Sequence, residues 1–414
     1  MKKLSNKQKL ISFVAILIVA VIIAIIITTN VINNNNQIAD EEYSATTINA
    51  GSNLIAKYIK KGEKIGGITG TLEVLNTADA TATAEDIEWG KTAYVNGVKI
   101  TGTRTPDNNY TFTDSYGNEV KVPGGFKVVN PEDNVTDGII IEDVSAGDLN
   151  TKGSQFVWIP VGDVYTDEEH TEANKKTIKL GRYDFATNPE GVEVQIIENQ
   201  EDIDNKEWEN EVNVSPYYYV ERVSSDYNAT AKDLGDFITK AYNSGGYYLG
   251  RYELGDALAT ESKHWTTGTA NPATCKSGVY PYTFLNQLEI STLCRNLYNS
   301  NEYDSDLINS YAWDTAIIFI QTFSDNKNYS MQVALQDTVA KCGEATNGIK
   351  KDEELHIFDM SGNVMEWSTE GYNDPSISFI VRGGFFGTEN VTGRRMYSIN
   401  SPDEYRAGRP ILYL

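Results

Sequence analysis

Four short segments, always in the same order along the chain, constrain the fold more than any other feature. They cover residues 155–162, 359–367, 381–384 and 408–413. No single segment decides the fold, because Trp, Gly and Arg are common in the cores and turns of many proteins. The ordered set is far more specific than any of its parts, and it indicates one domain that contains all four.

This ordered set resembles the domain of the formylglycine-generating enzymes, also called the sulfatase-modifying factor family, whose fold is a variant of the C-type-lectin fold. The resemblance implies an α+β domain with much irregular structure, which we place at residues 108–414. The family contains oxidases, iron enzymes and non-catalytic binding proteins. The resemblance therefore leaves the activity open.

The composition excludes one class of partner. The formal net charge of the 414-residue chain is −23, whereas binding to nucleic acid requires clusters of Lys and Arg that neutralise phosphates.

The chain has three cysteines, Cys275, Cys294 and Cys342. One disulfide with one free thiol and three buried thiols both stay open.

The first residues predict a membrane anchor. Residues 1–9 carry four lysines, and residues 10–27 are apolar except for Ser12. Eighteen helical residues span roughly 27 Å, close to the thickness of a bilayer's hydrocarbon core. We expect a basic cytoplasmic tail at 1–9 and an uncleaved transmembrane signal anchor at 10–28, with a cleaved signal peptide as the alternative. This predicts a single-pass protein of the cell membrane whose C-terminal domain is extracellular.

Residues 29–107 form a polar stretch that we interpret as an extracellular, β-rich stalk. Within it, residues 62–71 are echoed by residues 97–103, and the second copy belongs to a module at 79–103. Residues 84–88 suit a short helical turn, and the strands 92–95 and 98–100 flank Asn96 and Gly97, a strong hairpin signal. The module resembles one found in tail and surface proteins of Gram-positive bacteria and their phages.

After Pro106 the pattern becomes strand-like. Short strands are expected at 110–113, 119–122, 125–129, 138–142 and 156–159, the last stopped by Pro160. Residues 246–253 resemble the strand that precedes the first helix in the formylglycine-generating enzymes. Apolar residues at helical spacing predict amphipathic helices in 283–299 and 306–323. Ser305 or Asp304 is the expected N-cap of the second helix.

The segment 359–367 predicts a type I turn, with Asp359 first and Gly362 fourth, above a core-filling Trp367. The resemblance implies a structural calcium site there, built from oxygen ligands. Its ligands by position are the carbonyls of Ser361, Gly362 and Val364 and the side chain of Glu366. In the other interpretation, Glu366 caps the turn or pairs with an arginine such as Arg382. For Arg382 we favour bracing of the fold over ligand binding.

Catalytic signals are missing where the resemblance would place them. The family's aerobic oxidases bind copper(I) with two cysteines soon after the Gly-Gly pair, but residues 385–409 contain no cysteine. The iron enzymes need closely placed histidines, and His170, His264 and His356 are scattered. We therefore predict neither a copper nor an iron site and expect no catalytic residues.

The interval between Gly384 and Gly408 is rich in Asn, Tyr, Ser and Arg, which suit adaptable polar contacts around aromatic anchors. In C-type-lectin-like relatives diversified by retroelements, this interval carries the ligand-binding residues; an ordinary set of surface loops is the alternative. The expected contact residues are Phe385, Arg394, Arg395, Tyr397, Asn400 and Tyr405.

The sequence therefore predicts a membrane-anchored extracellular protein that binds or adheres to an unknown protein or glycan ligand. A formylglycine-generating (sulfatase-modifying) oxidase is the second hypothesis. A prophage tail-like or structural surface component is the third.

Overall fold

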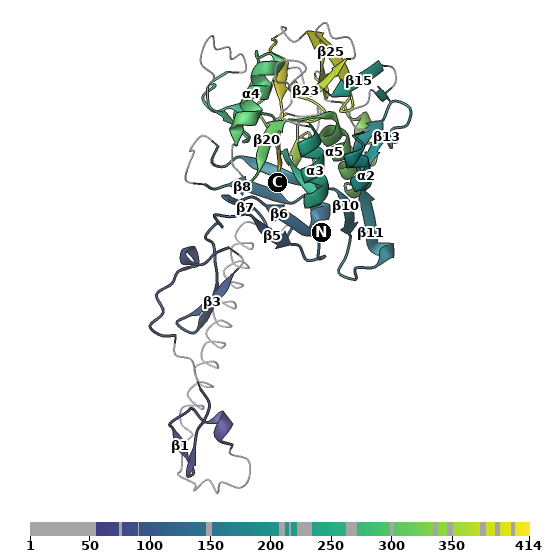
Figure 1. Ribbon diagram of the computed structural model, residues 1–414. Coiled ribbons are helices and arrows are strands. Elements are labelled where there is room, and N and C mark those ends of the chain that lie inside the picture. Colours follow the sequence, from purple (N-terminus) through teal and green to yellow (C-terminus); the bar gives the residue numbers. More distant parts are fainter. Residues whose placement is uncertain are drawn as a thin grey trace, which may run out of the picture. The chain divides into compact units, whose positions relative to one another are not determined.

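The computed structural model describes residues 55–414 except 74–76, 90, 146–150, 207–211, 215–216, 222–233, 262–270, 299–301, 334–337, 346–350, 373–377, 386–389 and 399–401. The chain forms two compact units, Met1–Ala80 and Thr81–Leu414, and each is described by itself (Figure 1). The predicted contact residue Asn400 and the predicted anchor at 10–28 lie outside the described residues.

A six-stranded antiparallel sheet forms the centre of the second unit. Its order is β20-β27-β16-β9-β8-β7. The strands are β7 (Phe126–Val128), β8 (Ile140–Asp143), β9 (Gln155–Pro160), β16 (Gly246–Gly250), β20 (Asp304–Leu307) and β27 (Pro410–Tyr413). The first and last of the four signature segments supply β9 and β27, which both pair with β16.

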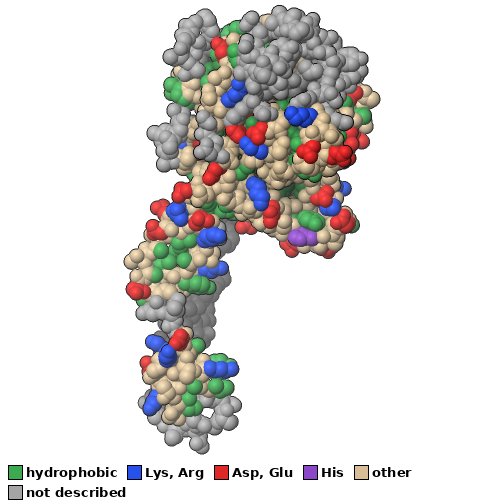
Figure 2. All heavy atoms as spheres, viewed as in Figure 1, with side chains coloured by type: hydrophobic (Ala, Val, Ile, Leu, Met, Phe, Trp, Pro, Cys, Tyr) green, Lys and Arg blue, Asp and Glu red, His purple; other side chains and the backbone are tan. Residues whose placement is uncertain are grey.

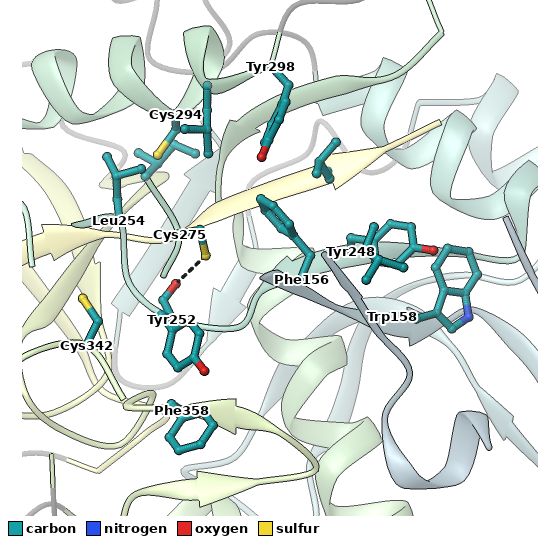
Figure 3. Close-up of a cluster of buried hydrophobic side chains, with 14 of the residues drawn as sticks. Phe156, Trp158, Tyr248, Tyr252, Leu254, Cys275, Cys294, Tyr298, Cys342 and Phe358 are labelled. Carbon is teal, nitrogen blue, oxygen red and sulfur yellow. Dashed lines mark hydrogen bonds between the residues drawn. The ribbon is translucent and has the colours of Figure 1, made fainter. Parts of the chain in front are cut away.

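Both faces of this sheet are covered, and the sequence of β9 shows why. Phe156 and Trp158 point into one core cluster, whereas Val157 and Ile159 point into another. Successive side chains of a strand face opposite sides, so a strand buried on both faces needs a continuous apolar run. Figure 3 shows Phe156, Trp158 and Tyr248 together in the first cluster.

Four α-helices occur among the described residues: α2 (Gln200–Asp204), α3 (Leu234–Ser244), α4 (Gln287–Leu297) and α5 (Ser310–Phe323). The apolar side of α4 joins the cluster that contains Trp158. The apolar sides of α3 and α5 join the cluster on the other face. Short 3-10 turns are η1 (Ala56–Tyr58), η2 (Ala84–Asp86), η3 (Val135–Asp137), η4 (Glu172–Asn174) and η6 (Tyr329–Met331).

A second sheet contains parts of the second and third of the four segments, residues 359–367 and 381–384. Its order is β14-β15-β23-β24-β25, and β26 pairs in parallel with β23. The strands are β14 (Val212–Val214), β15 (Tyr217–Glu221), β23 (Met365–Tyr372), β24 (Ser378–Arg382), β25 (Arg394–Ser398) and β26 (Arg406–Gly408). Among the described residues of the interval expected to bind ligand, 394–398 form β25 and 406–408 form β26.

Short hairpins make up the rest of the second unit. They are β3 (Thr92–Val95) with β4 (Val98–Thr101), β5 (Tyr110–Thr113) with β6 (Glu119–Val122), β10 (Gly162–Tyr165) with β11 (Lys175–Ile178), β12 (Leu180–Asp184) with β13 (Val192–Ile197), β21 (Glu353–Glu354) with β22 (Ile357–Phe358), and β17 (Gly255–Asp256) between β18 (Ala273–Thr274) and β19 (Tyr280–Pro281). In the first unit, β1 (Lys64–Ile65) pairs with β2 (Ile68–Thr69).

The predicted fold class needs two corrections. The expected α+β balance is wrong, because the described chain is mostly β-sheet with few helices. The amphipathic pattern does mark real helices, but each is short, and the Gly- and Tyr-rich stretches between them form hairpins. The second correction concerns the transmembrane helix placed before the stalk. No helix in the described part of the chain has the length and apolar character to cross a membrane, and residues 10–28 lie outside that part.

Local predictions fared better. The strands β5 to β9, the turn η2 and the β3–β4 hairpin lie where the sequence indicates. The second amphipathic helix begins later than expected, because Ser305 pairs with Leu412 in the central sheet instead of capping the helix. The N-cap is Asn309, whose side chain accepts a hydrogen bond from the backbone N–H of Ala312.

Candidate functional site

A buried network of charged side chains supports β25. Asp314 on α5 and Glu370 on β23 supply the carboxylates. The guanidinium groups come from three different strands, as Arg182 (β12), Arg382 (β24) and Arg394 (β25). Four of these side chains are at most 1% exposed, and the side chain of Arg394 is 8% exposed, so the network is buried. Because its five residues lie on four strands and one helix, the network joins these elements inside the protein.

The geometry of the network is close and mutual. Arg382 Nη2 donates to Asp314 Oδ1 at 2.6 Å, and Arg382 Nη1 donates to Glu370 Oε2 at 3.1 Å. Arg394 Nη2 donates to Asp314 Oδ2 at 2.7 Å, and its Nε donates to Glu370 Oε1 at 3.1 Å. Charge-assisted bonds of this kind are the stronger class of hydrogen bond. They hold β25 at a fixed position above α5.

Electrostatics keep Glu370 ionised within this network. Burial alone would raise the pKa of its carboxyl group, but Arg394, Arg382 and Arg182 outweigh burial and lower the pKa to about 2. The expectation that Arg382 braces the fold agrees with this position. Arg394, which the sequence placed among the ligand contacts, is engaged in the same network.

Three of the expected contact residues come together at the surface. The rings of Phe385 and Tyr405 stack with centroids 5.5 Å apart and planes 27° from parallel. The guanidinium carbon of Arg395 lies 5.8 Å from the centroid of the Phe385 ring. All three side chains are half-buried. We call Phe385, Arg395 and Tyr405 the aromatic cluster.

Tyr397 lies in a second stack built on the core. The Arg406 guanidinium is 3.9 Å from the centroid of the Tyr397 ring and 5.6 Å from that of Trp367. Trp367 is fully buried, as the sequence predicts, and its Nε1 donates to the carbonyl of Leu285 at 3.2 Å. The Tyr397 ring therefore packs on Arg406, which also lies over the buried Trp367.

The turn at residues 359–362 closes with a bond from the N–H of Gly362 to the carbonyl of Asp359 at 3.4 Å. Ser361, Gly362, Val364 and Glu366, the expected calcium ligands, are all buried beside it. Burial raises the pKa of the Glu366 carboxyl to about 7, although Arg409 opposes the rise.

Glu366 pairs with an arginine, as the alternative interpretation expected, but the arginine is Arg409 and not Arg382. Arg409 Nη2 donates to Glu366 Oε1 at 2.6 Å, and Arg409 Nε donates to Glu366 Oε2 at 2.9 Å. Both carboxylate oxygens are thus held by a fully buried guanidinium. This geometry does not fit a role as the anionic ligand of a calcium ion, and the calcium site stays a prediction of the resemblance. Among the described residues, no group of three or more His, Cys, Asp or Glu is placed to hold a metal ion.

Sequence reasoning missed a buried acid pair beside this turn. Asn363 Nδ2 donates to Glu253 Oε1 at 2.8 Å, and the N–H of Gly343 donates to Asp359 Oδ2. The other oxygens, Glu253 Oε2 and Asp359 Oδ1, are buried without a donor. Burial raises the pKa of both groups, and Glu253 adds to the rise at Asp359. Two adjacent buried carboxyls do not both ionise, so we expect a proton between them. Asp359 sits in a signature segment, but nothing in the sequence marks Glu253 as its neighbour.

The three cysteines are buried, free thiols. Figure 3 shows them apart from one another in the core, with Cys275 donating to the carbonyl of Tyr252 at 3.3 Å. Burial raises the pKa of Cys275 to about 12 and raises those of Cys294 and Cys342 well above the usual value. Since the thiolate is the reactive form, these positions do not suit redox or nucleophilic chemistry.

Comparisons with known proteins give no family. The sequence matches no protein-family model and no curated protein. Two solved structures are similar in part. The crystal structure of CarF has a TM-score of 0.30 at 16% identity, over 41% of this chain and 87% of that one. Treponema denticola variable protein 1 has a TM-score of 0.25 at 12% identity, over 41% and 85% respectively. Likenesses at these TM-scores carry no argument about fold or function.

Proposed function

We propose that this protein binds a protein or glycan ligand through the aromatic cluster of Phe385, Arg395 and Tyr405, with Tyr397 beside it on β25. The observation that carries the proposal is the stack of two half-buried rings with a guanidinium over one of them. Rings and arginines at the surface are the residue types that dominate binding energy in protein interfaces.

The network beneath β25 supports this role. Arg394 fixes the strand through Asp314 and Glu370, and Arg406 and Trp367 support Tyr397. A surface that is already ordered loses little conformational freedom on binding, so more of the contact energy becomes affinity. The buried arginines are then the frame, and the neighbouring half-buried side chains are the contact surface.

The chemistry of the cluster limits the ligand. Stacked rings offer flat apolar faces, and the Arg395 guanidinium offers several N–H donors in a plane. This combination suits the apolar face of a sugar ring with adjacent hydroxyl or carboxylate groups, or an extended peptide with an aromatic or acidic side chain. The exposed side chain of Met396, 41% accessible, adds adaptable apolar surface on the same strand.

The oxidase hypothesis has no comparable support. Its chemistry needs accessible thiolates, and the three cysteines are buried with raised pKa values. We therefore do not propose a redox activity.

The test uses labelled full-length protein on a glycan array and, in a second arm, a peptide array. The double variant Phe385→Ala, Tyr405→Ala should bind the preferred probe at least about tenfold more weakly, as expected for the loss of a binding hot spot. The matched control is Tyr94→Ala, an exposed tyrosine outside the cluster, which should bind like the parent. Saturable binding that the double variant retains in full, or no saturable binding to either array, would contradict the proposal.

A further inference from the structure

A surface pocket of about 560 Å³ lies at the C-terminal end of α5. Two segments far apart in the sequence form it: the end of α5 with the residues that follow, and the β21–β22 hairpin. Its lining residues are Phe323, Ser324, Asp325, Asn326, Glu354 and Leu355. Sites for small molecules usually occupy roughly 300–1,000 Å³, whereas a protein partner needs a wider surface. The pocket therefore has the size of a site for a small molecule.

The charged side chains that line this pocket are both acidic. Asp325 and Glu354 supply two carboxylates, and the described lining residues include no lysine, arginine or histidine. The last turn of α5 also lacks a basic residue. The C-terminal end of a helix carries the partial negative charge of its backbone carbonyls, which adds to the charge of the two acids. The pocket therefore favours a cation.

The acidic lining is not shared by the surroundings of the pocket. A second pocket of about 310 Å³ also borders α5, and it is lined by one acid, Glu190, and one base, Lys327. Lys327 Nζ donates to the carbonyl of Thr322 at 2.9 Å. On the face of the second unit shown in Figure 2, acidic side chains lie among basic ones. The excess of acid is thus a local feature of the larger pocket.

Hydrogen bonds hold one of the two carboxylates in position. Asn326 Nδ2 donates to Glu354 Oε1 at 3.1 Å and to Gln332 Oε1 at 2.7 Å. Gln332 Nε2 donates in turn to Oδ1 of Asp352 at 2.8 Å, and Asp352 is only 1% exposed. This chain of bonds ties Glu354 to the interior. A group that is already ordered loses little freedom when a ligand binds.

The apolar walls of the pocket are also held in place. The Phe323 ring packs against both core clusters, and its centroid is 5.5 Å from that of Phe319. Leu355 and His356 form the two-residue turn between β21 and β22, with φ of 45° and 67°. Arg251 Nε donates to the carbonyl of His356 at 3.1 Å and so fixes this turn. The walls therefore offer an aromatic face, which attracts cations, and an aliphatic side chain.

We propose that this pocket binds a small organic cation, an ammonium or guanidinium group on an apolar stem. Asp325 and Glu354 accept charge-assisted hydrogen bonds from the cation, and Phe323 and Leu355 contact the stem. A metal ion fits this lining less well. Calcium takes about six to eight oxygen ligands, and the described residues include no group of three or more His, Cys, Asp or Glu placed to hold an ion.

The pocket is separate from the proposed ligand-binding surface. None of the residues of the aromatic cluster lines it, so either proposal can fail without the other. The double variant of the aromatic cluster should therefore bind the cation like the parent.

The experiment is a titration of the full chain with phenethylammonium, which carries an ammonium group on a short aromatic stem. Phenethyl alcohol is the neutral counterpart of similar size. Isothermal titration calorimetry at low salt should show saturable binding of the cation. The alcohol should bind at least about tenfold more weakly, because it carries no charge to pair with the carboxylates. Added salt should weaken binding of the cation, since the pocket is open to solvent.

The double variant Asp325→Asn, Glu354→Gln removes both charges, and its Gln side chain can still accept the bond from Asn326. It should bind phenethylammonium at least about tenfold more weakly. The matched control Glu132→Gln, Glu168→Gln removes the same charge from exposed acids outside the pocket and should bind like the parent. Circular dichroism of each variant checks that the chain is folded.

Four results would overturn the proposal. They are a parent that shows no saturable binding of the cation, equal binding of the alcohol, full affinity in the folded pocket variant, and equal weakening by the pocket variant and its control. The last result would mean that the cation responds only to the net charge of the chain, which is −23.

Discussion

Arg394 Nη2 donates to Asp314 Oδ2 at 2.7 Å, which ties the strand that carries the proposed contact surface to the longest helix described. Five charged side chains share this buried site, three of them arginines and two of them acids. The site therefore carries one excess positive charge. This count predicts which substitutions the network tolerates.

Glu370→Gln should destabilise the protein by about 3–5 kcal/mol, because it leaves three buried guanidinium groups with one carboxylate. Arg394→Gln removes the excess charge instead and should cost less, about 1–3 kcal/mol for the lost hydrogen bonds. Denaturant unfolding of the two variants measures the difference. Asp163→Asn, which breaks a partly exposed ion pair with Lys175, is the control and should cost under about 1 kcal/mol. The reverse order of Glu370→Gln and Arg394→Gln would contradict this account.

The same carboxylate predicts how stability depends on pH. The folded pKa of Glu370, about 2, lies below its ordinary value of 4.5, so the unfolded state binds the proton more tightly. Its contribution, about 3 kcal/mol, should be complete above about pH 4.5 and should be lost as the pH falls toward 2. Unfolding measured along this pH range should show a shallower decline in Glu370→Gln than in the parent. Parallel curves would show that Glu370 is not responsible.

Trp158→Ala should cost about 3–5 kcal/mol by leaving a cavity in the central sheet. The ring is 1% exposed and packs edge-on against Tyr248 at a centroid distance of 5.0 Å. Trp158→Phe should lose less, since much of the apolar volume remains. Thermal unfolding separates the two variants, and a small effect from the alanine substitution would argue against this sheet as the centre of the domain.

Calcium offers a test of the resemblance against the geometry. Because Arg409 holds both oxygens of Glu366, adding calcium or a chelator should leave the midpoint of thermal unfolding unchanged. The resemblance to the formylglycine-generating enzymes implies the opposite, a midpoint that rises with calcium. A rise with calcium in the parent would show that the turn binds the ion in spite of the Arg409 contact.

Local patterns predicted the strands well, because the information lies in adjacent residues. The apolar run from Phe156 to Ile159 indicates a strand buried on both faces, and Asn96 with Gly97 indicates a hairpin. The start of α5 was misplaced, since Ser305 belongs to a strand whose partner Leu412 is more than 100 residues away. Tertiary pairing overrode the local helical pattern there.

The candidate site was predictable only in part. The sequence drew attention to Phe385, Arg395 and Tyr405, which do meet, because aromatic and arginine side chains were dense in that interval. It did not distinguish Arg394 from Arg395, adjacent residues of the same type. The difference depends on Asp314, 80 positions away in the chain. In the same way, the partner of Glu366 is Arg409, and no local pattern specifies that pair.

The central claim is that Phe385 and Tyr405 bind ligand while the buried network only supports them. The most direct measurement is a titration of the best array probe against the parent, the double variant Phe385→Ala, Tyr405→Ala, and the network variant Arg394→Lys. The account predicts that the double variant binds at least about tenfold more weakly, while its unfolding midpoint falls only modestly, because Phe385 packs partly against the core. It predicts that Arg394→Lys is less stable but keeps most of its affinity. Equal affinity of the double variant and the parent would contradict the claim.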